Sequence, residues 1–462
     1  MDHSTSPLPT TMSMCHLVAM PFPGRGHINP MMNLCKLLIS RKPEILISFV
    51  LTEEWFGFIE SDPKPDNICF RTIPNTIPPE RLKAADFPGF YEAVMTKMEA
   101  PFEQLLDQLE QPVTAIIGDI EVRWAIGLGN RRNIPVAAFW TMSISFFSML
   151  YHFDQLSREG HSPFDLLERV DYMSGISSLE MADLKTVFDK NDQRVMQLAL
   201  DCISRVPKSQ YLLFTSIYDL ESQVTNTLRE SLSFPVYPIG PAIPYPELKR
   251  KSSGSNSGDK ADPDYIQWLD SQPEDSVLYV SLGSFLSVSS TQMDEIAAGL
   301  RNSGVRFVWV ARRDASRLQE ICGETGLVLP WCDQLRVLCH SSVGGFWSHC
   351  GWNSTLEAVF GGVPILTFPL FLDQYPNSNQ IVEDWKIGWR VKRELGTENF
   401  VTKEEIADLV QSFMDLDSDE GKQLRNKARQ IRDICRKATE EGGSSVINLD
   451  AFIRNISQKH CH

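Results

Sequence analysis

Short runs of apolar, often β-branched residues recur along the first half of the chain, and segments with helical spacing separate them. These runs are His16–Met20, Ile45–Leu51, Ile68–Ile73, Val113–Gly118, Val136–Trp140 and Tyr211–Ser216. Most of them are nearly continuous rather than alternating, which is typical of parallel strands that helices cover on both faces. The pattern therefore predicts an α/β fold.

The pattern breaks after the sixth run. Tyr237–Pro246 reads YPIGPAIPYP, and the Ser- and Gly-rich stretch KRKSSGSNSGDKAD follows, which is typical of an exposed linker. A second α/β series then predicts strands at Val277–Ser281, Phe307–Ala311, Leu327–Leu329, Val343–Trp347 and Ile365–Phe368. Ligand sites in such sheets lie beyond the carboxyl ends of the strands, so two facing halves create a cleft between them.

Five segments are expected from this organisation. Residues 1–14 are expected to be disordered, residues 15–245 to form an N-terminal domain, residues 246–262 a linker and residues 263–445 a C-terminal domain. Residues 446–462 are expected to form a helix that packs back on the N-terminal domain. Its apolar stripe consists of Val446, Leu449, Phe452, Ile453 and Ile456.

Composition and charge narrow the class of protein. The 44 Lys and Arg against 59 Asp and Glu leave a net charge of −15, which disfavours nucleic acids and anionic membranes as partners. The first fourteen residues lack Lys, Arg and a long apolar run, so they do not read as a targeting peptide. The most apolar stretch, Ala137–Tyr151, is too short to cross a bilayer, and ten cysteines without a CxxC motif are too sparse for a disulfide scaffold. These features predict a cytoplasmic protein without stable membrane insertion.

Residues 331–374 hold the densest group of candidate ligand-binding residues. Their sequence is WCDQLRVLCHSSVGGFWSHCGWNSTLEAVFGGVPILTFPLFLDQ. A strand is expected to lead through the turn Ser348–Gly351 into a helix at Asn353, and a helix N-terminus binds anions through its free N–H groups. Glycine in that turn allows a ligand to approach the backbone. From the residues alone, Ser354 and Glu357 also match a capping box, in which both side chains serve only the helix.

This 44-residue segment resembles the signature box of the plant secondary-product UDP-dependent glycosyltransferases. The opening Trp, the HCGWNSTLE core and the closing Asp-Gln match that box, and the resemblance extends over the whole chain. It implies two facing Rossmann-like domains of the GT-B type, with an interdomain cleft and a UDP-sugar held mainly by the C-terminal domain.

The resemblance also implies how the donor is held. The residues expected at the uridine are Trp331 on the uracil face, Cys332 on its edge through the backbone, and Gln334 and Glu357 on the ribose hydroxyls. Those expected at the diphosphate are His349, Asn353, Ser354, the Gly351–Trp352 backbone and, upstream, Ser284. Those expected at the sugar are Trp352, Asp373 and Gln374, and a closing Gln usually accompanies glucose in this family. Asp333 stands where the box usually has proline, which predicts a less rigid loop and slightly weaker donor binding.

A candidate reacting pair lies in the first half. His27 follows the first strand in PFPGRGHINP, before a helix expected at Met31–Ile39, and Asp119 ends a strand in AIIGDIEVRWA. Taken singly, such residues are often solvated or cap a helix, but both match the catalytic dyad of the family, and Thr141 matches a position that can touch the transferred sugar. Imidazole is suited to removing a hydroxyl proton near neutral pH, and a carboxylate on its other nitrogen fixes the tautomer.

We therefore expect an inverting, metal-independent transfer of a sugar, glucose above all, from a UDP-sugar to a hydroxyl of a small hydrophobic acceptor. Phenolic, flavonoid and terpenoid acceptors fit the aromatic segments Phe87–Tyr91 and Phe139–Phe147. No cofactor and no metal are expected, because the triplets Asp262-Pro263-Asp264 and Asp415-Leu416-Asp417 are explained by chance in an acidic chain. The chain is expected to be a monomer.

Two alternatives stay open: a non-catalytic binder of UDP-sugars or small ligands, and the same reaction with a different UDP-sugar. A nicotinamide enzyme is disfavoured, since the Gly24/Gly26 and Gly127/Gly129 pairs both lack the third glycine of the dinucleotide motif.

Overall fold

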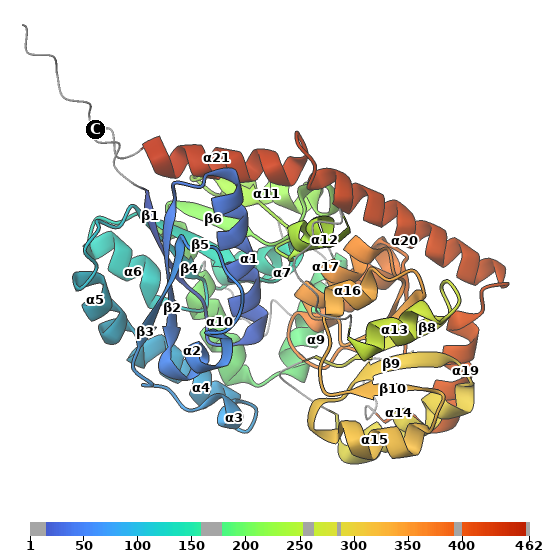
Figure 1. Cartoon of the computed structure of the whole chain (residues 1–462). Helices are drawn as coiled ribbons and strands as arrows, with labels where there is room; N and C mark the ends of the chain where they lie inside the picture. Colours follow the sequence, from blue (N-terminus) through green and yellow to red (C-terminus); the bar gives the residue numbers. More distant parts are fainter. Residues whose placement is uncertain (1–14, 159–177, 253–262, 284–287, 392–399, 459–462) are drawn as a thin grey trace, which may run out of the picture.

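Two parallel β-sheets organise the molecule, one in each half of the chain (Figure 1). The computed structural model describes residues 15–158, 178–252, 263–283, 288–391 and 400–458. Segment 1–14, expected to be disordered, and Ser284, expected at the diphosphate, therefore lie outside the described residues.

The first sheet has seven strands in the order β3-β2-β1-β4-β5-β6-β7. The strands are β1 (His16–Met20), β2 (Leu46–Thr52), β3 (Ile68–Ile73), β4 (Ala115–Asp119), β5 (Val136–Trp140), β6 (Tyr211–Phe214) and β7 (Val236–Pro238). The chain runs outward from β1 through β2 and β3 and then returns to β4 on the other side of β1. Such a reversal is the point where open α/β sheets bind ligands.

The second sheet has six parallel strands in the order β10-β9-β8-β11-β12-β13. The strands are β8 (Val277–Ser281), β9 (Arg306–Val310), β10 (Gly326–Leu329), β11 (Val343–Ser348), β12 (Ile365–Thr367) and β13 (Gly388–Arg390). The strand order reverses between β8 and β11. The second sheet therefore has its own ligand crevice, at the ends of these two strands.

Helices cover the faces of both sheets. In the first half they are α1 (Arg25–Arg41), α2 (Glu53–Ile59), α3 (Glu80–Lys83), α4 (Phe87–Lys97), α5 (Glu99–Asp107), α6 (Trp124–Arg131), α7 (Ile144–Arg158), α9 (Ser178–Lys190), α10 (Gln193–Ile203) and α11 (Ser222–Ser231). In the second half they are α12 (Tyr245–Ser252), α13 (Asp264–Asp270), α14 (Ser290–Ser303), α15 (Ala315–Cys322), α16 (Gln334–Leu338), α17 (Trp352–Gly361), α18 (Gln374–Asn379), α19 (Lys403–Met414), α20 (Asp419–Ala438) and α21 (Ser444–Gln458). Short helical turns lie at Val206–Lys208, Tyr218–Leu220, Arg312–Asp314 and Gln380–Asp384.

The strands are apolar because both of their faces are buried. In β1, Leu17 and Ala19 join the core on one side of the sheet, whereas Val18 and Met20 join the core on the other side. The second sheet repeats this arrangement, with Leu278 and Val280 on one side of β8 and Tyr279 on the other. Continuous apolar runs are the direct result of this two-sided burial.

The last helix returns to the first half. Helix α21 follows α20 along one side of the molecule (Figure 1) and packs against α1 and β7. Its residues Leu449, Phe452, Ile453 and Ile456 belong to the core that contains Leu17. A helix that follows the second half in the chain therefore completes the core of the first half.

One expected helix boundary is wrong. The helix expected from Met31 begins at Arg25, so His27 lies in the first turn of α1 rather than in a loop. The expected linker begins with helix α12, while residues 253–262 lie outside the described part of the chain. No helix in the described ranges is both long and apolar enough to span a bilayer.

Candidate active site

The carboxyl ends of β1 and β4 bring together the two residues of the expected reacting pair. His27 Nδ1 lies 2.8 Å from Asp119 Oδ2, and Thr141 Oγ1, just after β5, lies 3.2 Å from the same nitrogen. Because a carboxylate only accepts hydrogen bonds, Nδ1 donates its proton to Asp119 and Nε2 is the nitrogen that can receive a proton. The first-turn position of His27 in α1 fixes the side chain at the switch point of the sheet.

A second carboxylate, which sequence reasoning missed, lies on the other side of the imidazole. Glu121 Oε2 is 3.4 Å from His27 Nε2, and the Glu121 backbone N–H donates to Asp119 Oδ1 at 3.0 Å. Burial by itself lowers the pKa of His27, but the charges of Asp119 and Glu121 more than offset it and raise that pKa. The only sequence signal for Glu121 was its position two residues after Asp119, which does not distinguish it from an ordinary loop residue.

These three side chains are also the one group among the described residues whose geometry could hold a metal ion. The ligand atoms of His27, Asp119 and Glu121 lie within 4.8 Å of one another. Because Nδ1 donates to Asp119, Nε2 is the ring nitrogen that would face such an ion. The group is therefore first of all a histidine between two carboxylates.

The N-terminus of α17 forms the candidate diphosphate site at the switch point of the second sheet. Gly351 is the N-cap and no side chain of the described residues caps the helix, so its first N–H groups can serve an anion. The imidazole of His349 packs between Gly351 and Gly283, where an added Cβ would lie 2.5 and 2.7 Å from Nε2. Burial lowers the pKa of His349 to about 4, so a neutral imidazole, rather than a cation, lies beside this helix end.

The capping-box interpretation of Ser354 and Glu357 is wrong. Ser354 lies inside α17, three residues after the N-cap. The Glu357 carboxylate instead accepts a hydrogen bond from Gln334 Nε2 at 2.6 Å, and the same amide donates to Ser354 Oγ at 2.9 Å. Burial raises the pKa of Glu357 to about 7. Gln334 and Glu357, both expected at the ribose, therefore lie side by side without any ligand.

The start of the signature box lies beside this pair. Trp331 is 69% exposed, although it is a large aromatic side chain, whereas Cys332 is buried with Sγ 3.4 Å from Tyr279 Oη. Asp333 is the N-cap of α16 and accepts from the Arg336 N–H at 3.2 Å. The aspartate that replaces the usual proline therefore supplies a cap to the helix that carries Gln334.

The end of the box places two polar residues at the boundary between the halves. Asp373 is buried and accepts from Asn377 Nδ2 at 2.8 Å, and burial raises its pKa to about 7. Its carboxyl also interacts electrostatically with Glu121 and His27. Gln374 Oε1 accepts from the N–H groups of Leu370 and Phe371 at 2.8 and 3.0 Å, so only its amide NH₂ is available to a ligand.

Direct contacts join the two candidate sites. Asn353 Nδ2 donates to the carbonyl of Gly26 at 2.7 Å. That carbonyl is available because Pro30, four residues further along α1, has no N–H to donate to it. Phe87 and Phe371 also meet across the boundary, with ring centroids 5.5 Å apart. The His27–Asp119 pair of the first half and the N-terminus of α17 in the second half thus lie close together at the boundary between the halves. Trp352, expected at the sugar, is buried in the first turn of α17.

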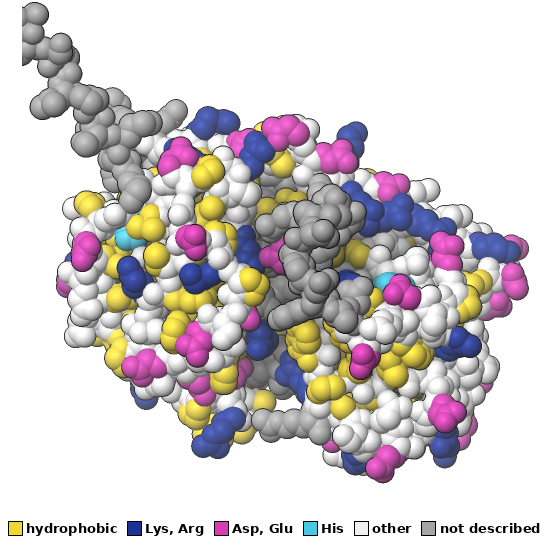
Figure 2. All heavy atoms as spheres, in the orientation of Figure 1, with side chains coloured by type: hydrophobic (Ala, Val, Ile, Leu, Met, Phe, Trp, Pro, Cys, Tyr) yellow, Lys and Arg dark blue, Asp and Glu magenta, His cyan; other side chains and the backbone are white. Residues whose placement is uncertain are grey.

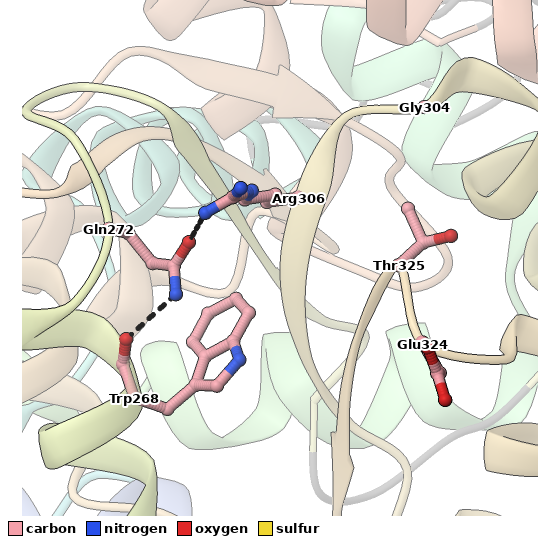
Figure 3. Close-up of a pocket in the computed structure, with 6 residues that line it drawn as sticks. All are labelled: Trp268, Gln272, Gly304, Arg306, Glu324 and Thr325. Atoms are coloured by element: carbon pink, nitrogen blue, oxygen red, sulfur yellow. Dashed lines mark hydrogen bonds between the residues drawn. The ribbon is translucent and has the colours of Figure 1, made fainter.

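A separate surface pocket of about 350 Å³ does not belong to this site. Trp268, Gln272, Gly304, Arg306, Glu324 and Thr325 line it (Figure 3). Arg306 begins β9 and donates to Gln272, which in turn donates to the Trp268 carbonyl at 2.9 Å. The pocket lies at the amino ends of β9 and β10, opposite to the carboxyl ends where ligands of such sheets bind.

Two parallel sheets, one with a helix N-terminus at its switch point and the other with a His–carboxylate pair, define a two-domain α/β protein. Residues 158–410 match the family model described as "UDP-glucoronosyl and UDP-glucosyl transferase". The chain is 51% identical to UDP-glycosyltransferase 87A2 of Arabidopsis thaliana, over 96% of this chain and 97% of that protein. It is 31% identical to 7-deoxyloganetin glucosyltransferase of Catharanthus roseus, over 97% of each chain.

Solved structures agree in fold. A structure of Phytolacca americana UGT2 with UDP-2fluoro-glucose and pterostilbene superposes with a TM-score of 0.76 at 26% identity, covering 96% of this chain and 100% of that one. Medicago truncatula UGT71G1 with UDP-glucose gives a TM-score of 0.77 at 26% identity, with 97% and 99% coverage. The chain belongs to the UDP-glycosyltransferase family, it has the GT-B fold, and it is a plant-type enzyme that transfers sugar from a UDP-sugar to an acceptor.

Proposed function

We propose that this enzyme transfers glucose from UDP-glucose to a hydroxyl of a small hydrophobic acceptor, with inversion and without a metal, and that His27 is the general base with Asp119 as its partner. The observation that carries the proposal is the 2.8 Å contact between His27 Nδ1 and Asp119 Oδ2, in a helix whose Gly26 carbonyl contacts Asn353 of the anion site. The contact with Asp119 orients the imidazole of His27, and the contact between Gly26 and Asn353 holds the start of α1 next to the donor site.

The proposed step follows from these positions. Nε2 of His27 takes the proton of the acceptor hydroxyl, and the hydroxyl oxygen bonds to the anomeric carbon. The bond from that carbon to the β-phosphate oxygen breaks, and its electron pair leaves with UDP. Asp119 stabilises the imidazolium that forms, and the free N–H groups of α17 stabilise the charge that develops on the diphosphate. Attack from the face opposite to UDP gives a β-glucoside from an α-linked donor.

The donor assignment is supported by side chains of the second half and by a named relative. Trp331 offers an exposed indole face for the uracil, and Gln334 and Glu357 offer adjacent polar groups for the ribose. Gln374 keeps an amide NH₂ free at the boundary between the halves, close to Asp373, which suits the hydroxyls of glucose. The Catharanthus relative is named a glucosyltransferase, and we carry that donor over to this chain.

The acceptor is proposed to lie beside His27 and against the aromatic residues that surround it. Phe22 packs on the His27 ring with centroids 5.0 Å apart and on Tyr91 at 5.4 Å, and Phe87 stacks on Tyr91. Phe139, by contrast, lies in the core on the far side of the sheet. An apolar, aromatic wall beside the base suits phenolic, flavonoid or terpenoid acceptors.

We place the enzyme in the cytoplasm as a monomer. The cysteines of the described residues are free thiols, which suits a reducing compartment. Acidic side chains are spread over both halves and interspersed with basic ones on the face drawn in Figure 2, so nucleic acid is not a proposed partner.

Replacement of the base tests the function. His27→Ala should lower turnover of UDP-glucose with a simple phenol by about 10²–10⁴-fold, the usual contribution of a general base, while calorimetry shows UDP binding unchanged. Near-normal turnover in this variant would remove His27 from the mechanism. A wild-type protein that binds UDP but releases none from UDP-glucose with a broad phenol and alcohol panel would favour the non-catalytic binder.

A further inference from the structure

Glu121 places an ionisable group on the reactive side of His27. The residue lies just after β4, and its backbone N–H donates to Asp119 Oδ1, which turns the chain back toward the base. Its Oε2 then lies 3.4 Å from His27 Nε2, and its side chain is only 7% exposed. Asp119 already orients the imidazole through Nδ1, so Glu121 is not needed to fix the tautomer.

The surroundings of Glu121 do not fully compensate its burial. Burial raises the pKa of its carboxyl, with a further contribution from Asp119, by more than His27, Tyr91 and Lys83 lower it. Lys83 itself donates to the Pro23 carbonyl at 2.7 Å and lies over the rings of Phe22 and Phe90. A carboxylate has about four lone-pair positions, so this one can accept further hydrogen bonds from a ligand.

The reacting hydroxyl of an acceptor must come close to the same carboxylate. A general base takes a proton from an atom about 2.6–3.2 Å away, and Glu121 Oε2 is already 3.4 Å from Nε2. A substituent on the carbon next to the reacting hydroxyl therefore lies within reach of Glu121. A hydroxyl there can donate to the carboxylate, whereas a hydrogen leaves it unsatisfied and an ether oxygen faces it with lone pairs.

We propose that Glu121 is a specificity-determining residue of the acceptor site, and that it accepts a hydrogen bond from a second hydroxyl adjacent to the one that receives the sugar. This inference rests on the proposed function and narrows its acceptor class to vicinal diols, catechols in particular. The unglycosylated hydroxyl of the pair is bound by Glu121, and its neighbour loses its proton to His27.

Three acceptors of nearly equal size test the proposal: 4-methylcatechol, 4-methylphenol and 2-methoxy-4-methylphenol. With saturating UDP-glucose, the wild-type kcat/KM should favour the catechol over the phenol by about tenfold or more, because a site built around a hydrogen bond discriminates strongly against a ligand that lacks it. The methyl ether should be the poorest acceptor. In Glu121→Ala the catechol advantage should fall to about threefold or less, whatever change in the absolute rates the loss of a charge beside His27 causes.

Two controls separate the outcomes. Glu92→Gln changes an exposed glutamate on the same helix as Tyr91, in an ion pair with Arg194, and should keep the wild-type ratio. Calorimetry of the three acceptors with the UDP-bound protein measures the same preference without turnover, and unchanged UDP affinity shows that each variant is folded.

The proposal is overturned if Glu121→Ala keeps the catechol preference, or if it loses activity equally with all three acceptors, which would mean that Glu121 only positions His27. Absence of turnover with every acceptor in the wild type would instead contradict the proposed function. The calorimetric ratio would still decide the role of Glu121 in that case.

Discussion

Burial and ligand binding act in opposite directions on the proton of Glu357. Burial raises the pKa of this carboxyl to about 7, and the neutral hydrogen bond that Gln334 donates only partly offsets that effect. Ribose hydroxyls would add donors that favour the charged form and lower the pKa. Since the folded pKa lies above the ordinary value, ionisation also lowers the stability of the free protein as the pH rises from about 4.5 to 7.

Donor affinity should therefore depend on pH through Glu357. If UDP binds the carboxylate form, its binding releases a proton, and affinity should rise by up to about tenfold per pH unit as the pH increases toward 7 and level off above it. In Glu357→Gln this rise should disappear, leaving only the titration of the diphosphate itself, which wild type and variant share. Calorimetry with UDP at pH 6 and pH 8 measures the difference.

Asp373 provides the matched control, because burial also raises its pKa to about 7 but it is expected at the sugar. Asp373→Asn should keep the pH dependence of UDP binding. An identical pH dependence in wild type and Glu357→Gln would show that Glu357 does not contact the ribose.

At the scale of elements, Pro30 gives helix α1 a role in joining the halves. Proline inside a helix removes one hydrogen bond, at a cost of about 3 kcal/mol, and here the freed acceptor is the Gly26 carbonyl that contacts Asn353. The helix thus loses an internal bond one residue before the proposed base. The contact to Asn353 replaces it.

Pro30→Ala should separate the stability of α1 from the function of this contact. The alanine N–H can bond to the Gly26 carbonyl and compete with Asn353, so the melting temperature should stay equal or rise, while kcat should fall several-fold because the base and the donor site are held together less well. Thermal unfolding and steady-state kinetics measure the two effects, and Pro43→Ala, at a proline outside α1, serves as the control. Unchanged kcat together with a higher melting temperature would show that the contact has no catalytic importance.

Elements and sites differed in how far the sequence predicted them. The strands were predictable because a strand that is buried on both sides must be apolar throughout, as β1 and β4 show. The start of α1 was not, since Gly24, Gly26 and Pro30 read locally as a loop. The resemblance named the donor-site positions. The position of Glu121 beside His27 and the Asn353–Gly26 contact depend on how segments distant in the chain meet, which no local sequence pattern predicts.

At the scale of the whole molecule, helix α21 makes the stability of the first half depend on the end of the chain. Phe452 is fully buried and packs on the rings of Tyr211 and Tyr237, with centroids 5.7 and 5.8 Å away. The residues proposed to bind the nucleotide, in contrast, belong to the second half. A substitution in this core should therefore lower the stability of the first half while leaving nucleotide binding by the second half nearly unchanged.

Phe452→Ala should destabilise the protein by about 3–5 kcal/mol, as expected for loss of a buried aromatic ring, while the dissociation constant of UDP measured below the transition stays within about twofold of wild type, since distant sites act independently. Ile447→Ala is the matched control, because Ile447 is on the same helix but 55% exposed, and its effect should stay within about 0.5 kcal/mol. Thermal unfolding followed by circular dichroism and calorimetry with UDP give both quantities. Loss of UDP binding in Phe452→Ala at a temperature where the protein is still folded would mean that the core under α21 supports the donor site directly.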